Sequence, residues 1–299
     1  MELEVIRQLD DAQLSALKSL FDAARESDHH EPLGEHKWLD LVHGGRRAFA
    51  GVVGREGEAV VGYAHLSRHH KPRGAQWGLE VVVHPNHRDK GAEETLLRRA
   101  LDVVAEEGGG HIHWWVFQPT DAHGEAAANL GFKKGRDLLH MKVSLPPSFE
   151  PHLPKGVRLR SFEVGRDEEA WIGVNNSAFA QHPEQGAWDR ETLERRMAED
   201  WFDPDGFLLA EDDSGKLVGF CWTKINPECG EIYVVGVDPS HHGSGLGKAL
   251  TIAGLQNMAS RGVKAGCLYV DAAQEAPLSM YRKLGFEQDH LDRAYVRDI

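Results

Sequence analysis

Apolar and polar residues alternate along the chain in patterns that predict both helices and strands. Over roughly residues 10–25, charged side chains are interspersed at helical intervals with the apolar residues Leu14, Leu17, Leu20 and Phe21. Farther along, the apolar runs 207–210 and 217–223 flank the turn-forming segment 212–215, which predicts a β-hairpin. Helical and extended segments therefore occur together, and the chain is expected to form mixed α+β structure.

A proline-rich stretch divides the chain into two halves. Residues 144–156 contain four prolines, and they predict an extended linker because proline neither continues a helix nor donates to a strand ladder. We therefore expect two domains, over residues 1–145 and 146–299.

The two halves are related in sequence. Leu130-Gly-Phe132 and Leu284-Gly-Phe286 stand 154 residues apart, which is the difference between 132 and 286. The same offset pairs Val83-His-Pro with Val237-Asp-Pro, and Trp114-Trp-Val with Leu268-Tyr-Val. Three blocks in one register indicate a duplicated domain, with a mixed α+β sheet in each copy.

Composition narrows the classes of partner. The chain has 299 residues, enough for two cores, and a net charge of −13, which argues against nucleic acid as a main partner. No apolar run approaches the roughly 20 residues of a membrane span, so no membrane association is expected. The three cysteines form no Cys-x-x-Cys pair, which favours a reduced, cytoplasmic setting in which Cys221 and Cys267 are small buried hydrophobic residues.

A glycine-rich turn in the second half is the strongest candidate for a ligand site. Gly243, Gly245 and Gly247 follow a predicted strand over 231–236 and open a helix predicted over about 247–260. Glycines at these positions let backbone N–H groups approach an anion, and the helix N-terminus adds partial positive charge. The turn lies too late in its domain for a dinucleotide fingerprint, and Ala249 stands where a Walker motif requires Ser or Thr.

Several motifs together resemble a known family. The Val237-Asp-Pro entry, the glycine turn and helix, and Tyr281-Arg-Lys-Leu-Gly-Phe286 resemble the acetyl-CoA motif of the GNAT superfamily of acetyltransferases. The blocks 175–186, 201–207, 222–224 and 231–237 resemble the mycothiol synthases, tandem-domain actinobacterial enzymes that acetylate the cysteinyl amine of Cys-GlcN-inositol. The resemblance implies two tandem GNAT domains, each a mixed, mostly antiparallel sheet flanked by helices, and acetyl-CoA as the acetyl donor.

The resemblance also assigns roles to individual residues. Glu231 is expected to act as general base and Tyr281 as general acid, both in contact with the substrate, with a backbone N–H near Val235 or Val237 as oxyanion donor. Further substrate contacts are expected from Glu35, Glu184 and Lys224. Acetyl-CoA is expected to contact Val235, Gly236, Val237, His242, Gly243, Ser244, Gly245, Leu246, Gly247 and Lys248, together with Val81, Val82 and Val83 in the first half.

The first half has lost several of these features. At the positions of Gly243, Gly245 and Gly247 it has Asp89, Gly91 and Glu93, and at those of Tyr281 and Glu231 it has Ala127 and Trp77. Acidic side chains repel a pyrophosphate, so the first domain is predicted to be a non-catalytic support. Retained acetyl-CoA binding stays open, because Arg88 and Lys90 keep positive charge there.

Two other functions fit parts of the pattern. A tandem GNAT enzyme could acetylate another small-molecule or peptide amine, although the segment 182–186 favours the mycothiol substrate. A non-catalytic acyl-CoA sensor or scaffold is the alternative of another class, and the pairing of Glu231 with Tyr281 argues against it. Paired histidines show no zinc-type spacing, so no metal is expected, and the internal duplication favours a monomer.

Overall fold

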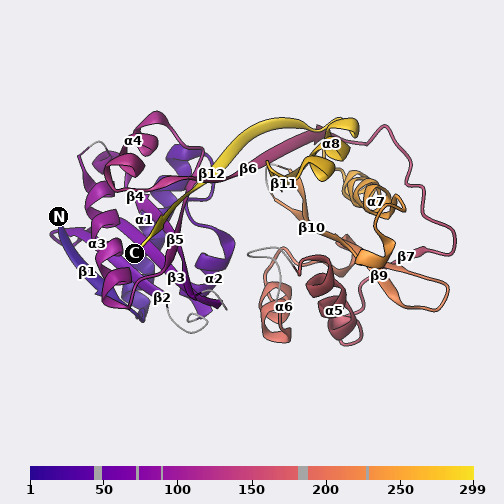
Figure 1. Cartoon of the computed structure of the whole chain (residues 1–299), viewed down its shortest axis with the longest axis horizontal. Coiled ribbons are helices and arrows are strands. Elements are labelled where there is room, and N and C mark those ends of the chain that lie inside the picture. The colour runs from indigo at the N-terminus through magenta and orange to yellow at the C-terminus, as the bar shows by residue number, and fades with distance from the viewer. Residues whose placement is uncertain (44–48, 72–73, 89, 181–187, 227–228) are drawn as a thin grey trace. The chain divides into compact units, whose positions relative to one another are not determined.

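The computed structural model describes residues 1–43, 49–71, 74–88, 90–180, 188–226 and 229–299. For residues 43, 69–71 and 74, only the backbone is described. The chain forms two compact units (Figure 1). The first unit combines Met1–Asp137 with Leu291–Ile299, and the second comprises Leu138–His290. Each unit therefore contains residues from both halves of the sequence.

The first unit is a six-stranded sheet with helices on both faces. Its strand order is β1 (Glu2–Ile6), β2 (Phe49–Glu56), β3 (Ala59–Lys71), β4 (Gly74–Val83), β5 (His111–Phe117) and then β12 (Glu287–Asp298). All neighbours are antiparallel except β4 and β5. Its helices are α1 (Asp11–Asp28), α2 (Glu35–His43), the 3₁₀ turn η1 (Pro85–His87), α3 (Ala92–Glu106) and α4 (Asp121–Asn129).

The second unit repeats this plan. Its strand order is β7 (Arg158–Ser161), β8 (Phe207–Glu211), β9 (Leu217–Ile225), β10 (Gly230–Val237), β11 (Ala265–Asp271) and then β6 (Lys133–Ser144). Here β10 and β11 are the parallel neighbours, and the other pairs are antiparallel. Its helices are α5 (Glu168–Ala178), α6 (Arg190–Met197), η2 (Pro204–Gly206), η3 (Pro239–His241), α7 (Leu246–Ser260) and α8 (Glu275–Lys283). The mixed, mostly antiparallel α+β fold predicted from the sequence is confirmed in both units.

The last strand of each repeat belongs to the sheet of the other repeat. Strand β6 ends the first half of the sequence but pairs with β11, with Met141 opposite Leu268. Strand β12 ends the second half but pairs with β5, with Tyr295 opposite Trp114. Each unit is therefore completed by a strand from the other half of the sequence.

Local sequence explains where the first helix begins and which face it buries. Asp10 caps α1, because its side chain accepts from the Gln13 backbone N–H at 2.7 Å while the Gln13 side chain accepts from the Asp10 N–H at 3.1 Å. The predicted apolar stripe is buried through Leu17, Leu20 and Phe21. It forms one core of the first unit, and α3 and α4 form another core with the strands.

The second unit buries an aromatic core under α5 and α6. Trp222 stacks on Phe207 with ring centroids 4.3 Å apart and meets Trp171 edge-on at 5.7 Å. Helix α7 packs against β9 and β10 and is apolar on nearly all sides, which is expected of a helix buried along its length. In the described part of the chain, no helix is long and apolar enough to span a membrane.

Candidate active site

Strand β10 departs from regular pairing where the sequence places the chemistry. Its register against β9 shifts between Ile232 and Val234, as in a β-bulge. Against β11, only Gly230 and Glu231 are paired, opposite Gly266 and Cys267. Beyond Glu231, β10 therefore continues without ladder partners from β11, which leaves its backbone groups on that side available to a ligand.

The predicted glycine turn follows directly from this strand. Asp238 caps η3 by accepting from the Ser240 N–H at 2.9 Å, and its own N–H donates to the Val218 carbonyl. His242 lies in the exposed turn, and its Nε2 is 3.1 Å from the Val237 carbonyl oxygen. The His242 ring is therefore engaged with the end of β10, at the position where the sequence suggested a phosphate contact.

Two glycines of the turn are required by the backbone. Gly243 has φ 75° and Gly245 has φ 85°, values that other L-residues rarely adopt. Gly245 caps α7 at its N-terminus, and no atom lies within 4 Å of a Cβ added at either position. Gly247 already belongs to the helix, where an added Cβ would meet Val237 Cγ2 at 3.6 Å. The turn thus presents backbone and open space at a helix N-terminus, which suits an anion.

The side chains of the strand end divide between two faces. An added Cβ at Gly236 would lie 2.7 Å from the Phe220 ring, so this glycine makes room for the aromatic core. Val235 and Val237 point the other way and are half-buried. Gly236 therefore contributes backbone, while the two valines offer the apolar surface expected to meet the cofactor.

Glu231 is held by a residue that the motifs did not identify. The Asn226 side-chain amide donates to Glu231 Oε2 at 3.0 Å. Asn226 directly follows β9, and its backbone N–H donates to the Cys229 carbonyl at 2.9 Å. The Asn226 amide therefore orients the Glu231 carboxylate, and the half-buried Glu231 side chain keeps access to solvent.

Lys224 is brought to Glu231 by the strand register. The two residues are direct cross-strand partners in the β9–β10 pair. The Lys224 ammonium lies 4.6 Å from the Trp201 ring centroid and 5.6 Å from that of Tyr233. A cation held over aromatic faces beside a carboxylate gives this end of the sheet mixed polarity, which suits a hydroxyl-rich acceptor.

Tyr281 lies on the inward face of α8. It is buried, and its ring packs edge-on against Phe286 at 5.6 Å. Burial raises the pKa of the Tyr281 phenol well above its usual value, and the nearby Cys221 thiol raises it further. Cys221 lies in β9 directly opposite Val235 of β10. The interaction with Cys221 therefore connects Tyr281 to the strand that is expected to bind the cofactor. The phenol stays protonated at neutral pH, as a general acid requires.

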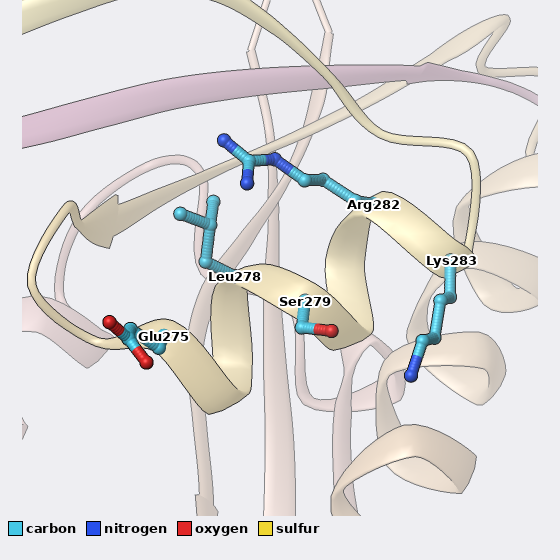
Figure 2. Close-up of a pocket in the computed structure, with 5 residues that line it drawn as sticks. All are labelled: Glu275, Leu278, Ser279, Arg282 and Lys283. Atoms are coloured by element: carbon cyan, nitrogen blue, oxygen red, sulfur yellow. The ribbon is translucent and has the colours of Figure 1, made fainter.

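An open cavity lies on the other side of α8. It has a volume of about 610 Å³ and is lined by Glu275, Leu278, Ser279, Arg282 and Lys283 (Figure 2). Arg282 and Lys283 leave the last turn of the helix in different directions (Figure 2). Neither Glu231 nor Tyr281 lines this cavity.

In the first unit, the positively charged side chains of the corresponding loop are bound by other groups of the protein. Both terminal nitrogens of Arg88 donate to Asp28 at 2.6 Å, and Lys90 donates to the Asn86 carbonyl at 2.7 Å. Glu93 stands in the first turn of α3, where burial raises its pKa to about 7. Asp89 is outside the described residues. Strand β4 ends in Val81, Val82 and Val83, the counterparts of Val235, Gly236 and Val237 at the end of β10. Val82 is buried in the core beside α1.

The remaining predicted substrate contacts are placed unequally. Glu35 begins α2 in the first unit, just after Gly34, whose N–H donates to the buried Glu80 carboxylate at 2.7 Å. Glu80 also forms an ion pair with the buried Lys37, with 2.5 Å between Lys37 Nζ and Glu80 Oε1. These contacts hold the start of α2 in place. Glu184 falls in 181–187, outside the described residues, and its role stays a prediction.

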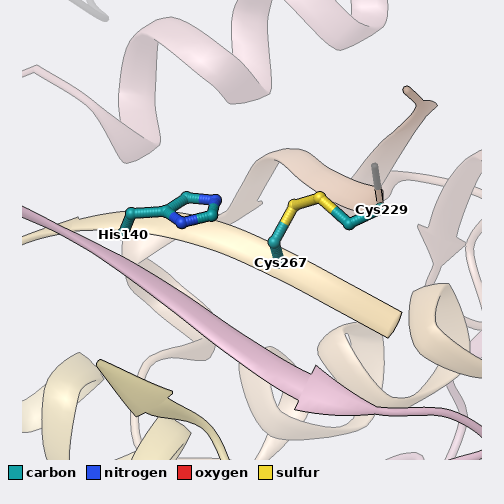
Figure 3. A group of neighbouring side chains, drawn as sticks. All are labelled: His140, Cys229 and Cys267. Atoms are coloured by element: carbon teal, nitrogen blue, oxygen red, sulfur yellow. A yellow bond between two sulfur atoms is a disulfide. The ribbon is translucent and has the colours of Figure 1, made fainter. Parts of the chain in front are cut away.

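The expectation that the cysteines are reduced is wrong for two of the three. Cys229 and Cys267 form a disulfide with Cα atoms 6.2 Å apart (Figure 3). Cys221 is a buried free thiol. A nitrogen of His140 and the two sulfurs lie within 4.8 Å of one another. His140, Asp289 and His290 form a second group spaced closely enough for a metal. Sequence spacing could not reveal either group, because their members come from β6, β11, β12 and the residue just before β10.

Comparison with known proteins agrees with this geometry. The model of the acetyltransferase (GNAT) family matches residues 14–132 and again 171–286. The chain is 43% identical over 290 residues to the mycothiol acetyltransferase of Thermobispora bispora, covering 94% of this chain and 95% of the relative. It is also 43% identical to the mycothiol acetyltransferase of Thermomonospora curvata, covering 96% and 94%.

Solved structures show the same tandem fold. A tandem GNAT protein from the clavulanic acid biosynthesis pathway superposes with a TM-score of 0.75 at 19% identity, covering 99% of this chain and 98% of that one. A GCN5-related N-acetyltransferase from Sphaerobacter thermophilus gives 0.73 at 23% identity, covering 99% and 95%. With the fold, the glycine turn and these relatives in agreement, this chain belongs to the mycothiol acetyltransferase family, within the GNAT acetyltransferases.

Proposed function

We propose that this chain transfers the acetyl group of acetyl-CoA directly to the cysteinyl amine of Cys-GlcN-inositol and so forms mycothiol. The observation that carries the proposal is the glycine turn at the start of α7, reached by a bulged strand that leaves the ladder of β11 just beyond Glu231. This arrangement offers backbone N–H groups to a pyrophosphate and a strand edge to a pantetheine arm. The relatives named mycothiol acetyltransferase support the acceptor.

Glu231 is the proposed general base. An amine attacks a thioester only in its neutral form, so a carboxylate must accept its proton directly or through water. Asn226 orients the Glu231 carboxylate, and the cross-strand Lys224 supplies a cation beside it. A backbone N–H of Val235 or Val237 is the proposed donor to the tetrahedral oxyanion.

Tyr281 is the proposed general acid. When the tetrahedral intermediate collapses, the C–S bond breaks and the coenzyme thiolate takes a proton, which a protonated phenol can give. The raised pKa of Tyr281 keeps that proton in place until the transfer. Direct transfer is favoured over a cysteinyl intermediate, because burial raises the pKa of the Cys221 thiol to about 12 and the other two cysteines are paired.

The first domain is proposed to be a non-catalytic support. The internal pairing of Arg88 with Asp28 supports this role, because the guanidinium is already neutralised by a carboxylate. Glu35 is proposed as its contribution to acceptor binding. We also propose that the protein is cytoplasmic and monomeric, that it needs no metal, and that its partners are the two small-molecule substrates rather than nucleic acid or membrane.

The test is a steady-state assay with acetyl-CoA and Cys-GlcN-inositol on wild type, Glu231→Gln and Tyr281→Phe, with the acetylated product quantified by mass spectrometry. Loss of a general acid or base is expected to lower kcat by about 10²–10⁴ in each variant. Arg282→Gln, which lies next to Tyr281 in α8 but lines the open cavity, is the matched control. Wild type that binds acetyl-CoA but leaves this amine unmodified would overturn the acceptor while leaving the GNAT assignment intact.

A further inference from the structure

The disulfide lies at the point where the catalytic strand is joined to its neighbour. Cys229 directly precedes β10, and Cys267 lies in β11 opposite Glu231. Gly230 and Glu231 are the residues through which β10 pairs with β11 before the two strands separate. The covalent bond therefore reinforces the sheet beside the proposed base.

A short chain of hydrogen bonds connects the disulfide to the Glu231 carboxylate. The Cys229 carbonyl accepts from the Asn226 backbone N–H at 2.9 Å, and the Asn226 amide donates to Glu231 Oε2 at 3.0 Å. Cys229 thus holds Asn226, which in turn orients the carboxylate. Any displacement of Cys229 relative to β11 changes how Asn226 meets Glu231.

A titratable side chain lies beside the buried pair. His140 lies beside the sulfurs, with a ring nitrogen within 4.8 Å of both (Figure 3). Its Nδ1 is 3.1 Å from Asp289 Oδ2, which orients the ring. The neutral imidazole can accept the proton of an incoming thiol, and exchange depends on the thiolate that this forms. Cys221 is also buried but is a free thiol.

We propose that Cys229–Cys267 is a thiol–disulfide exchange site, through which small thiols control the position of Glu231. A thiolate attacks one sulfur, the Cys229–Cys267 bond breaks, and a mixed disulfide and one cysteine thiolate form. A second small thiol displaces the first, giving two free cysteines and one small-molecule disulfide. Two electrons pass from the small thiols to the pair, and the cysteine thiolates take from solvent the protons that the small thiols released.

The consequence is feedback by the product, an inference that rests on the proposed function because both the acceptor and mycothiol carry a thiol. When small thiols are abundant, the pair is reduced, Asn226 is held less firmly against Glu231 and acetyl transfer slows. When they are oxidised or scarce, the pair re-forms and the base is held in place. In a reducing compartment, disulfides that persist are typically transient or redox-sensing, which fits this role. Cys229 is 6% and Cys267 2% exposed, so exchange requires local opening around the two sulfurs.

The first experiment measures catalysis at two defined redox states. Wild type is equilibrated with thiol–disulfide buffers of 2-mercaptoethanol, and its free thiols are counted by alkylation and mass spectrometry. Turnover is then followed with an S-methylated acceptor, which cannot exchange. Reduction is expected to lower kcat about tenfold, since misplacing a catalytic group by a fraction of an ångström to 1 Å costs up to about 10². The KM for acetyl-CoA is expected to stay within about twofold, and reoxidation to restore kcat.

Variants separate this role from simple stabilisation. Cys229→Ser/Cys267→Ser is expected to match reduced wild type and to ignore the redox buffer, whereas Cys221→Ser keeps the two-thiol transition. Equal kcat in both redox states, with only the melting temperature changed, would show a purely structural bond and overturn the proposal. Stoichiometric zinc in the isolated protein would also overturn it, because the two thiols and His140 would then form a metal centre.

A second readout does not depend on the acceptor. Amide hydrogen exchange over residues 229–237 is expected to accelerate about tenfold or more on reduction, because β10 loses its covalent tie to β11. Unchanged exchange there would overturn the proposal even if an acceptor is found. Faster exchange without acetylation of the S-methylated acceptor would instead contradict only the proposed substrate.

Discussion

Gly245, which caps α7, and Gly247, in its first turn, should respond differently to the addition of one methyl group. Gly245 has φ 85°, and nothing lies within 4 Å of an added Cβ, so Gly245→Ala meets backbone strain without any steric clash. A left-handed conformation costs a residue with a Cβ about 1–2 kcal/mol. In a domain of this size, that lowers the melting temperature by about 2–4 °C per kcal/mol.

Gly247→Ala should leave stability intact and weaken ligand binding. Its Cβ would make an ordinary contact with Val237 Cγ2 at 3.6 Å, and alanine in place of glycine favours a helix by up to about 1 kcal/mol. The methyl group would, however, stand at the first turn of α7, where the pyrophosphate is proposed to approach the backbone. Losing one hydrogen bond to a charged group costs about 1.5–3 kcal/mol, or about ten- to a hundredfold in the Kd of acetyl-CoA.

The assay combines thermal unfolding with calorimetric titration of acetyl-CoA. Gly262→Ala is the matched control, because Gly262 has φ 84° and an open Cβ position but lies at the far end of α7. We expect it to lose stability like Gly245→Ala while keeping wild-type affinity. Wild-type affinity in Gly247→Ala would refute the placement of the pyrophosphate, and wild-type stability in Gly245→Ala would refute the strain argument.

Three further predictions concern charged side chains. Lys37→Met leaves the buried Glu80 carboxylate without its ion-pair partner and should lower the free energy of unfolding by about 3–5 kcal/mol. The double variant Lys37→Met/Glu80→Gln should recover part of this loss, as denaturant titrations would show. Glu93 keeps its proton up to about pH 7 in the folded state, against 4.5 as its ordinary value, so folding stability falls as the pH rises between them. Glu93→Gln should therefore gain melting temperature over wild type at pH 8 and not at pH 4. Lys224→Met should raise the KM of the acceptor about tenfold and leave that of acetyl-CoA unchanged, as separate substrate titrations would show.

The duplication and the glycine turn were predictable because each leaves a local record in the sequence. A left-handed backbone demands glycine, and Gly243 and Gly245 have positive φ. The predicted hairpin and helix over about 247–260 are likewise confirmed as β8, β9 and α7. In all of these, neighbouring residues determine the structure, so spacing along the chain was informative.

Features that depend on long-range pairing left no such record. Asn226 is an ordinary turn residue until β9 and β10 pair and bring its amide to Glu231. Cys229 and Cys267 are 38 residues apart with no recognisable spacing, and only the parallel pairing of β10 with β11 makes them neighbours. Likewise, Arg88 looked like a free positive charge until Asp28, 60 residues earlier, was found to neutralise it.

The sequence pattern could not predict the exchange of β6 and β12, because the two strands occupy equivalent positions in the repeat. The offset of 154 residues that relates the halves also relates Met141 to Tyr295 and Trp114 to Leu268, so either strand could take either place in the same register. The side chains decide between the two arrangements. Arg293 is the equivalent of Leu139, and in β12 its Nε donates to Asp137 Oδ1 at 2.7 Å. Leu139 is only 7% exposed in β6.

This difference predicts how the separated halves will behave. In a fragment of residues 146–299, β12 would have to pair with β11, which would put Arg293 at the buried position of Leu139 and remove its partner Asp137. Burying a charge without a partner costs several kcal/mol, a large fraction of a domain's stability. The fragment should therefore be insoluble or unfolded alone and recover its circular dichroism and acetyl-CoA binding when co-expressed with residues 1–145. Arg293→Leu should partly rescue the lone fragment. If the unmodified fragment folds alone with full stability, the chain connections between the strands determine the exchange, and these side chains do not.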